Sequence, residues 1–160
     1  MKLLKKESDL GHWSFSKSFD QKDYFGFIYC IKNMKSSQYY IGKKQFRNQG
    51  RKSSKHYGKE MAWRTYTGSS KWLNEDIVKL GKENFNFVIV DLYKTKGEMY
   101  YAEAYTQMCL GVMTRYVDPE KKVPTFYNRN IGAVRFLPKS PPSLKNETFI
   151  NSMKRQLGKS

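Results

Sequence analysis

Positively charged side chains are clustered between residues 43 and 64, where they could bind the phosphate groups of a polyanion. The stretch holds eight Lys or Arg residues against a single acid, Glu60, which leaves a net charge of +7. Clustered cations bind nucleic-acid backbones because they release condensed counterions. Four aromatic residues lie among them, which favours a nucleic-acid surface over a merely solubilising loop. The cations are Lys43, Lys44, Arg47, Arg51, Lys52, Lys55, Lys59 and Arg64, and the aromatic residues are Phe46, Tyr57, Trp63 and Tyr66.

The whole chain shares this basic character. Its 160 residues contain 30 Lys and Arg against 14 Asp and Glu, a formal net charge of +16. This length suits one domain with tails, and 39% hydrophobic residues exclude a chain that is disordered throughout. Cys30 and Cys109 form no disulfide framework or zinc motif, so we expect a reducing cytoplasm. With His12 and His56 as the sole histidines, a histidine-rich metal centre is excluded. We expect no membrane span and no signal peptide.

Two tyrosines, Tyr29 and Tyr40, lie eleven residues apart in short apolar and aromatic stretches. Turn-type residues at 33–37 separate the two stretches, and this pattern predicts a β-hairpin. Either tyrosine alone is ordinary in a strand. The pair is less ordinary, because Gly-Lys-Lys and the basic stretch follow directly after Tyr40-Ile41.

Further elements are expected around this hairpin. Ser69 and Ser70 are candidate N-caps for a helix that ends at Gly81, and residues 84–93 predict the strongest strand. Thr95 and Glu98 match a capping box that opens a helix running to about residues 108–113. The order predicts an α+β fold, a small three-stranded antiparallel or mixed sheet flanked by helices. We expect the first helix to pack through a core stripe of Trp72, Leu73, Ile77 and Leu80.

Three segments are expected along the chain. Residues 1–22 are predicted to form a poorly specified basic N-terminal arm, and residues 23–132 the folded domain. Residues 133–160 are predicted to form a proline-containing linker and a basic tail. Within that tail, Phe149, Ile150, Met153 and Leu157 could line a short amphipathic helix.

The chain resembles the GIY-YIG nuclease superfamily across roughly residues 24–131. Tyr40-Ile41-Gly42 matches the second motif, and Phe27-Ile28-Tyr29 matches the first except that Phe27 replaces its glycine. The block from Trp63 to Ser70 resembles one found in many phage-encoded members, and Tyr127-Asn128 resembles the pair that closes the family's core. The resemblance implies metal-dependent hydrolysis of a DNA phosphodiester.

The resemblance also implies a metal ligand, Glu103. A carboxylate suits Mg²⁺, which usually takes one or two protein carboxylates and keeps several waters; Mn²⁺ is the expected substitute. Glu98 lies five residues earlier, about 140° away around a helix, so it cannot share the ion and is expected to be a capping residue. One carboxylate favours a single metal ion over a two-metal mechanism.

The same resemblance gives the remaining site residues their expected roles. Tyr29 would activate or orient water, and as a base it would need a pKa lowered by the nearby cations Lys43, Lys44 and Arg47. Tyr40 would support the water or a phosphate oxygen. Arg47 is preferred over Arg51 as the arginine that stabilises the developing charge. Where many relatives carry a histidine, Tyr66 is preferred over His56, and Asn128 would be a structural brace.

The resulting hypothesis is a phage or mobile-element, homing-like DNA endonuclease in a bacterial or phage-infected cell, acting as a monomer or weak homodimer. Lys43, Lys44, Arg51, Lys52, Lys55, Lys59 and Arg64 would bind the DNA. Two alternatives stay open: a non-catalytic nucleic-acid-binding module, and a degenerate nuclease that has lost its activity.

Overall fold

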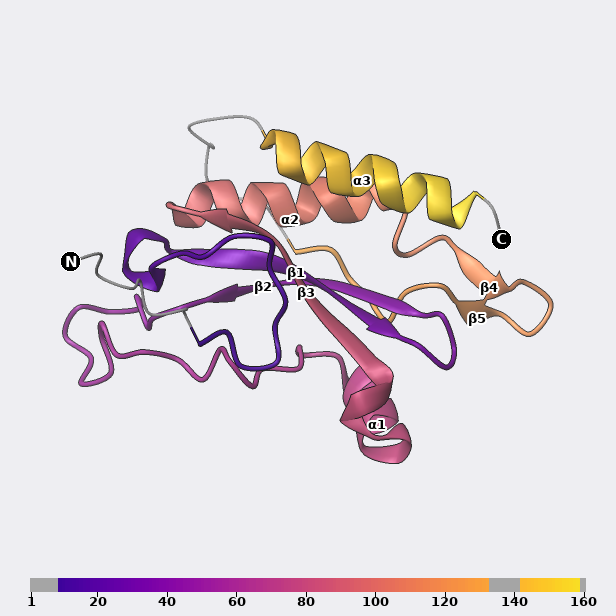
Figure 1. The fold of residues 1–160 in the computed structure, drawn as a ribbon, viewed down its shortest axis with the longest axis horizontal. Helices are drawn as coiled ribbons and strands as arrows, with labels where there is room; N and C mark the ends of the chain where they lie inside the picture. The colour runs from indigo at the N-terminus through magenta and orange to yellow at the C-terminus, as the bar shows by residue number, and fades with distance from the viewer. Residues whose placement is uncertain (1–8, 133–141, 159–160) are drawn as a thin grey trace, which may run out of the picture.

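A computed structural model describes residues 9–132 and 142–158. Its main sheet is antiparallel and has the strand order β2-β1-β3 (Figure 1). The strands are β1 (Gly26–Asn33), β2 (Tyr39–Gln45) and β3 (Phe85–Tyr93). The expected hairpin and strand are therefore confirmed, and so is the α+β fold class. β2 lies at the edge of the sheet, where residues 125–128 bond to its first half through Tyr39 and Ile41.

The central strand β1 is covered on both faces, as its nearly continuous apolar sequence requires. Side chains alternate along a strand, so Phe27, Tyr29 and Ile31 belong to one core cluster and Ile28 and Cys30 to the other. Phe27 is completely buried. The phenylalanine that replaces the glycine of the first motif is thus a core residue of this fold.

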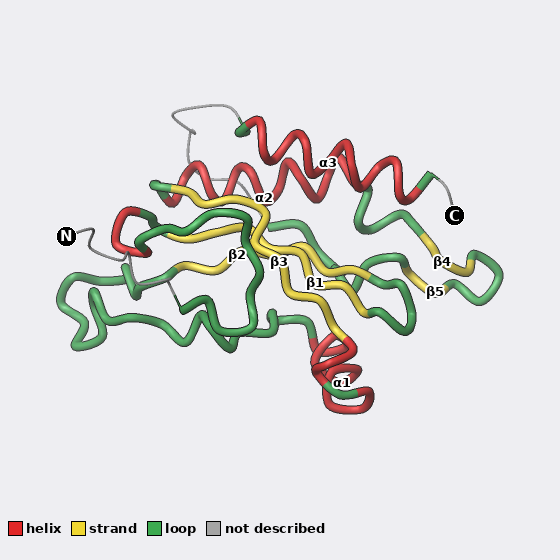
Figure 2. The backbone as a smooth tube through the Cα atoms, in the orientation of Figure 1, coloured by secondary structure: helices red, strands yellow, loops and turns green. Residues whose placement is uncertain are grey.

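Helices cover the two faces unequally (Figure 2). The helices α2 (Lys96–Leu110) and α3 (Leu144–Leu157) lie side by side over one face, whereas α1 (Lys71–Leu80) lies at one end of the opposite face (Figure 1). Capping fixes their starts, because Ser70, Thr95 and Ser143 accept hydrogen bonds from the first-turn amides of α1, α2 and α3. Short elements complete the chain: the 3₁₀ helices Gln21–Asp23 and Lys82–Asn84, and the hairpin β4 (Tyr116–Asp118) with β5 (Val123–Pro124).

The described part of the N-terminal segment, residues 9–22, differs from the expected loose arm. Trp13 is 4% exposed, and its indole donates a 2.7 Å hydrogen bond to the Trp63 carbonyl. Ser14 pairs with the edge of β3 through Phe87 and Ile89. The sequence here is polar with scattered aromatic residues, and Trp13 anchors the segment to the sheet.

Two expectations about helices also change. Trp72 is 49% exposed, while Leu73 beside it is fully buried, so Trp72 does not belong to the core stripe. The expected basic tail contains α3, whose Ile150 and Met153 are buried against the layer of α2. The apolar residues of this helix were predicted correctly, although its role as a packed layer was not.

The expected linker lies largely outside the described residues. Within the described ranges, none of the helices has the length and apolar character needed to cross a bilayer.

Candidate active site

Tyr29 and Tyr40 meet on the face of the sheet opposite α2. Tyr29 pairs with Gly42 in the register of β1 and β2, and its ring lies directly over that glycine. A Cβ atom at position 42 would lie 2.6 Å from Cζ of Tyr29, so a larger residue would displace the ring. The rings of Tyr29 and Tyr40 have centroids 6.1 Å apart. The glycine of the second motif therefore makes room for the tyrosine of the first.

A network of hydroxyl groups joins these tyrosines to the segment before α1. Tyr29 hydrogen-bonds to the hydroxyl of Tyr66, which in turn contacts Ser69. The hydroxyl groups of Tyr40 and Ser69 lie 3.1 Å apart. Tyr29 is 1% exposed, whereas Ser69 lies at the surface, so the network runs from the core to solvent. Sequence reasoning placed Tyr66 at the site but treated Ser69 as a helix cap.

Gly68 lets the chain approach Tyr40 closely enough to complete this network. Its φ of +87° lies in the region that favours glycine, and a Cβ atom there would be 2.9 Å from the Tyr40 ring. The turn between Tyr66 and Ser70 is consequently shaped around the ring of Tyr40.

The electrostatics of Tyr29 are opposite to the expected ones. Burial raises the pKa of Tyr29 well above its usual value of 10.0, and the negative charge of Glu103 raises it further. The cations expected to lower it lie elsewhere: Lys43 contacts Glu103, and Lys44 lies 4.1 Å from the centroid of the Tyr66 ring. Burial likewise raises the pKa of Tyr66. Tyr29 therefore holds its proton and acts here as a hydrogen-bond donor.

Glu103 approaches the edge strand from the other face of the sheet. It lies on α2 and is 8% exposed, and its carboxylate forms an ion pair with the Lys43 ammonium. Burial raises the pKa of Glu103, and Lys43 opposes this rise. Side chains alternate along β2, so Lys43 points to the opposite face from Gly42 and Lys44. Glu103, which pairs with Lys43, and the tyrosines therefore lie on opposite faces of the edge strand β2.

The donors around Glu103 fit a hard divalent cation that keeps several waters. No group of three or more His, Cys, Asp or Glu side chains in the described ranges could hold a metal by itself. One turn further along α2, Oε1 of Gln107 is a buried oxygen with no hydrogen-bond partner among the described residues. A lone carboxylate with a nearby amide oxygen is an oxygen-only donor set, which is the kind that Mg²⁺ and Mn²⁺ accept.

Asn128 holds β2 in place beside these groups. Its side chain accepts a 3.0 Å hydrogen bond from the Ile41 amide and donates a 2.8 Å bond to the Ile41 carbonyl. Gln107 donates a further bond of 3.0 Å to the same carbonyl. These bonds fix the central residue of the second motif, which is the geometry expected of a structural brace.

The basic stretch divides into two groups. Lys43 and Lys44 are held by protein partners, and Arg64 pairs with Glu60 and Asp9. Side chains further along the loop are exposed instead: Arg51, Lys52, Lys55, His56 and Lys59.

Arg47 forms an isolated β-bridge with Glu60, and whether it or Arg51 serves the reaction stays a prediction. An expectation about the aromatic residues of this stretch is not met by its packing. Phe46 and Trp63, expected on a nucleic-acid surface, are 0% and 1% exposed and belong to the core. Tyr57 is the exposed one of the four aromatic residues, at 42%.

His12 is a neighbour of the site to which no sequence motif points. Its Nε2 atom lies 3.0 Å from the Tyr66 carbonyl, and its ring stacks on Phe87 with centroids 3.9 Å apart. Burial and the charge of Lys82 lower the pKa of His12 to about 4. A carbonyl can only accept, so the neutral ring carries its proton on Nε2.

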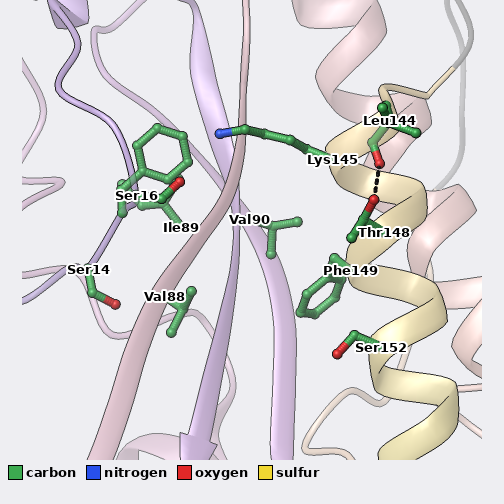
Figure 3. A pocket seen from close by; sticks show the side chains of 11 residues that line it. Ser14, Ser16, Val88, Ile89, Val90, Leu144, Lys145, Thr148, Phe149 and Ser152 are labelled. Carbon is green, nitrogen blue, oxygen red and sulfur yellow. Dashed lines mark hydrogen bonds between the residues drawn. The ribbon is translucent and has the colours of Figure 1, made fainter.

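A cavity of about 600 Å³ lies away from this site, between β3 and α3 (Figure 3). Its lining is largely apolar, with Val88 and Val90 on the β3 side and Phe149 on the α3 side. It contains no carboxylate and none of the predicted site residues.

A sheet whose first two strands carry paired tyrosines, beside a helix with a buried glutamate, is the arrangement of a GIY-YIG nuclease domain. Residues 12–131 match the family model described as "Putative endonuclease segE, GIY-YIG domain". Because the match spans three quarters of the sequence, the chain belongs to this family of endonuclease domains. No curated protein matches the chain, and no solved structure does. Membership of a nuclease family implies a DNA substrate.

Proposed function

We propose that this chain is a divalent-metal-dependent DNA endonuclease that hydrolyses phosphodiester bonds by attack of water. The observation that carries the proposal is the convergence of the hydroxyl network and Glu103 on the edge strand β2, around Gly42 and Lys43. A phosphodiester placed along this edge would meet hydroxyl donors on one face and the carboxylate on the other. Family membership supports the nuclease class, and the metal and the division of labour belong to the proposal.

The residues of the site would divide the work as follows. Glu103 would hold a single Mg²⁺ or Mn²⁺ ion, which when bound polarises a phosphoryl oxygen and offsets the charge that develops there. Tyr29 keeps its proton, so it would orient the attacking water by a hydrogen bond. The contacts through Tyr66 to Ser69 would connect this position to solvent, and Tyr40 would support a phosphate oxygen.

DNA would be bound by two sets of groups. The exposed cations Arg51, Lys52, Lys55 and Lys59 would contact phosphates, and Arg47 would approach the scissile phosphate when DNA is present. We further propose a phage or mobile-element, homing-like role, because the block Trp63–Ser70 resembles that of phage-encoded members. The cytoplasm of a bacterial or infected cell is the proposed location, and a monomer or weak homodimer the proposed state.

Incubation with supercoiled and linear DNA tests the activity directly, with Mg²⁺, with Mn²⁺ and with EDTA. We expect nicks or breaks with either metal and none with EDTA. Binding without cleavage under every metal would instead favour a nucleic-acid-binding module. Cleavage that continues in EDTA would contradict the metal assignment while leaving the endonuclease class intact.

A further inference from the structure

The ion pair between Lys43 and Glu103 bears on how a metal could reach the carboxylate. Glu103 is buried, and Lys43 is its one charged partner among the described residues. The Lys43 ammonium also lies 4.2 Å from the centroid of the Tyr100 ring, so an aromatic face supports it in this position. Lys43 is therefore held where it compensates a desolvated carboxylate, which would otherwise be costly to bury.

A divalent cation on Glu103 would meet this ammonium at contact range. Like charges at such a distance repel strongly when the surroundings are partly dehydrated. Metal binding is therefore opposed as long as Lys43 remains on the carboxylate, and it is favoured once Lys43 has another anionic partner.

A DNA phosphate is the anionic partner that this edge of the sheet can offer. Lys43 lies on the edge strand β2, past the residues that 125–128 cover, and its side chain is 23% exposed, so part of it already reaches solvent. Its four-carbon stem is flexible and its ammonium binds phosphate as a point charge. Rotation of the side chain would move the charge from Glu103 toward a backbone that lies along β2.

We propose that Lys43 is an exchangeable counter-ion, which pairs with Glu103 until a DNA phosphate takes over its ammonium. This inference rests on the proposed metal-dependent cleavage of DNA. By linkage, DNA then raises the affinity of Glu103 for a divalent cation, and the cation raises the affinity for DNA by the same factor. The enzyme would bind its metal firmly only where a substrate is present.

Equilibrium binding of Mn²⁺ tests the proposal without any measurement of cleavage. Free Mn²⁺ is followed by electron paramagnetic resonance, with and without a short DNA duplex, in a Tyr29→Phe background that keeps the DNA intact. With Lys43 present, we expect DNA to lower the Mn²⁺ dissociation constant about tenfold, within the usual range of coupling between sites. In Lys43→Met, Mn²⁺ should bind about tenfold more tightly without DNA, and DNA should have little further effect.

Lys44→Met is the matched control. It removes the same charge from the next residue of the same strand, but Lys44 lies over the Tyr66 ring on the opposite face. This variant should leave the Mn²⁺ affinity without DNA unchanged. Lys43→Arg keeps the positive charge that pairs with Glu103, and it controls for a loss of folding at this position. This variant should bind Mn²⁺ no more tightly than the native protein does.

Two results would overturn the proposal: unchanged Mn²⁺ affinity in Lys43→Met, or equal tightening in Lys44→Met. Its failure can be distinguished from failure of the proposed function by Glu103→Gln. If Glu103→Gln abolishes Mn²⁺ binding while Lys43→Met changes nothing, Glu103 is still the ligand and the counter-ion role is wrong. If Glu103→Gln binds Mn²⁺ as before, the metal assignment itself is wrong.

Discussion

Cations at the edge of β2 are held by partners within the protein, whereas those of the loop at residues 51–59 stand in solvent. Lys43 pairs with Glu103 and Lys44 covers Tyr66, but Lys52 and Lys55 are exposed. The contrast separates two tasks. Groups that act on a reacting atom must be fixed in position, whereas groups that attract a polyanion need only their charge. Substitutions at the edge should therefore change the rate of cleavage, and substitutions in the loop should change the affinity for DNA.

The largest effect is expected from Glu103→Gln. Loss of the carboxylate removes the proposed metal ligand, so the single-turnover rate of cleavage should fall by about 10³-fold or more. The affinity for DNA, measured by fluorescence anisotropy without divalent metal, should not fall, because the loop is untouched and Lys43 is released from Glu103. Glu98→Gln, on the same helix but about 140° around its axis, is the control and should cleave normally. Cleavage by Glu103→Gln at the native rate would contradict the assignment.

Tyr29→Phe should follow, with a loss of about 10²–10⁴-fold in the chemical step, the usual range for a proton-handling group. The change removes one hydroxyl and its hydrogen bond to Tyr66, and the ring still covers Gly42. Single-turnover rates at saturating DNA measure the step, and the dissociation constant for DNA should not move. If Tyr40→Phe is the slower variant, the roles proposed for the two tyrosines must be exchanged.

The third prediction concerns the loop at residues 51–59, where substitutions should change the affinity for DNA and leave the cleavage rate as it is. Four exposed cations that each contact a phosphate should contribute about −3.6 to the slope of log K against log salt, from roughly 0.9 per contact. The double variant Lys52→Glu and Lys55→Glu should bind less tightly and flatten that slope by about 2. The cleavage rate of bound DNA should be unaffected. The same charge change at Lys154 and Arg155, exposed on α3, is the control. A strong loss of rate at saturation would contradict the division between edge and loop.

Much of this comparison could be predicted from local sequence. Alternation and turn residues indicate the hairpin, capping residues mark the starts of α1 and α2, and the spacing of Tyr29 and Tyr40 identifies the family. These signals are local, because each depends on residues within one or two turns of the chain. Trp72 shows the limit of such local signals, because it was predicted in the core stripe and is exposed. The apolar pattern of a helix does not say which of two neighbouring residues faces the sheet.

What could not be predicted depends on contacts between distant segments. The pKa of Tyr29 is set by burial beneath Trp13 and by Tyr66, neither of which is adjacent in sequence. The pairing of Lys43 with Glu103 joins residues 60 positions apart. Counting cations near Tyr29 predicted a lowered pKa, because charge density along the chain does not reveal that the hydroxyl group is buried.

The smallest effect concerns His12, which ties the N-terminal segment to the Tyr66 side of the site. Its pKa is lowered to about 4 in the folded protein, so the unfolded chain binds a proton at higher pH than the folded chain does. Stability is therefore fully present above about pH 6.5 and declines as the pH falls toward 4. A proton on Nδ1 would be buried without a partner and close to Lys82.

His12→Gln isolates this contribution, because its amide can still donate to the Tyr66 carbonyl but does not titrate. Between pH 7 and pH 4.5, the free energy of unfolding should fall further in the native protein than in His12→Gln, by about 1–2 kcal/mol once the partial exposure of the ring is allowed for. Urea titrations at the two pH values measure the difference. His56→Gln, in the exposed loop, should lose as much stability as the native protein. Equal losses in His12→Gln and the native protein would show that the His12 ring is accessible to protons, and that the site is tied to the N-terminal segment by packing alone.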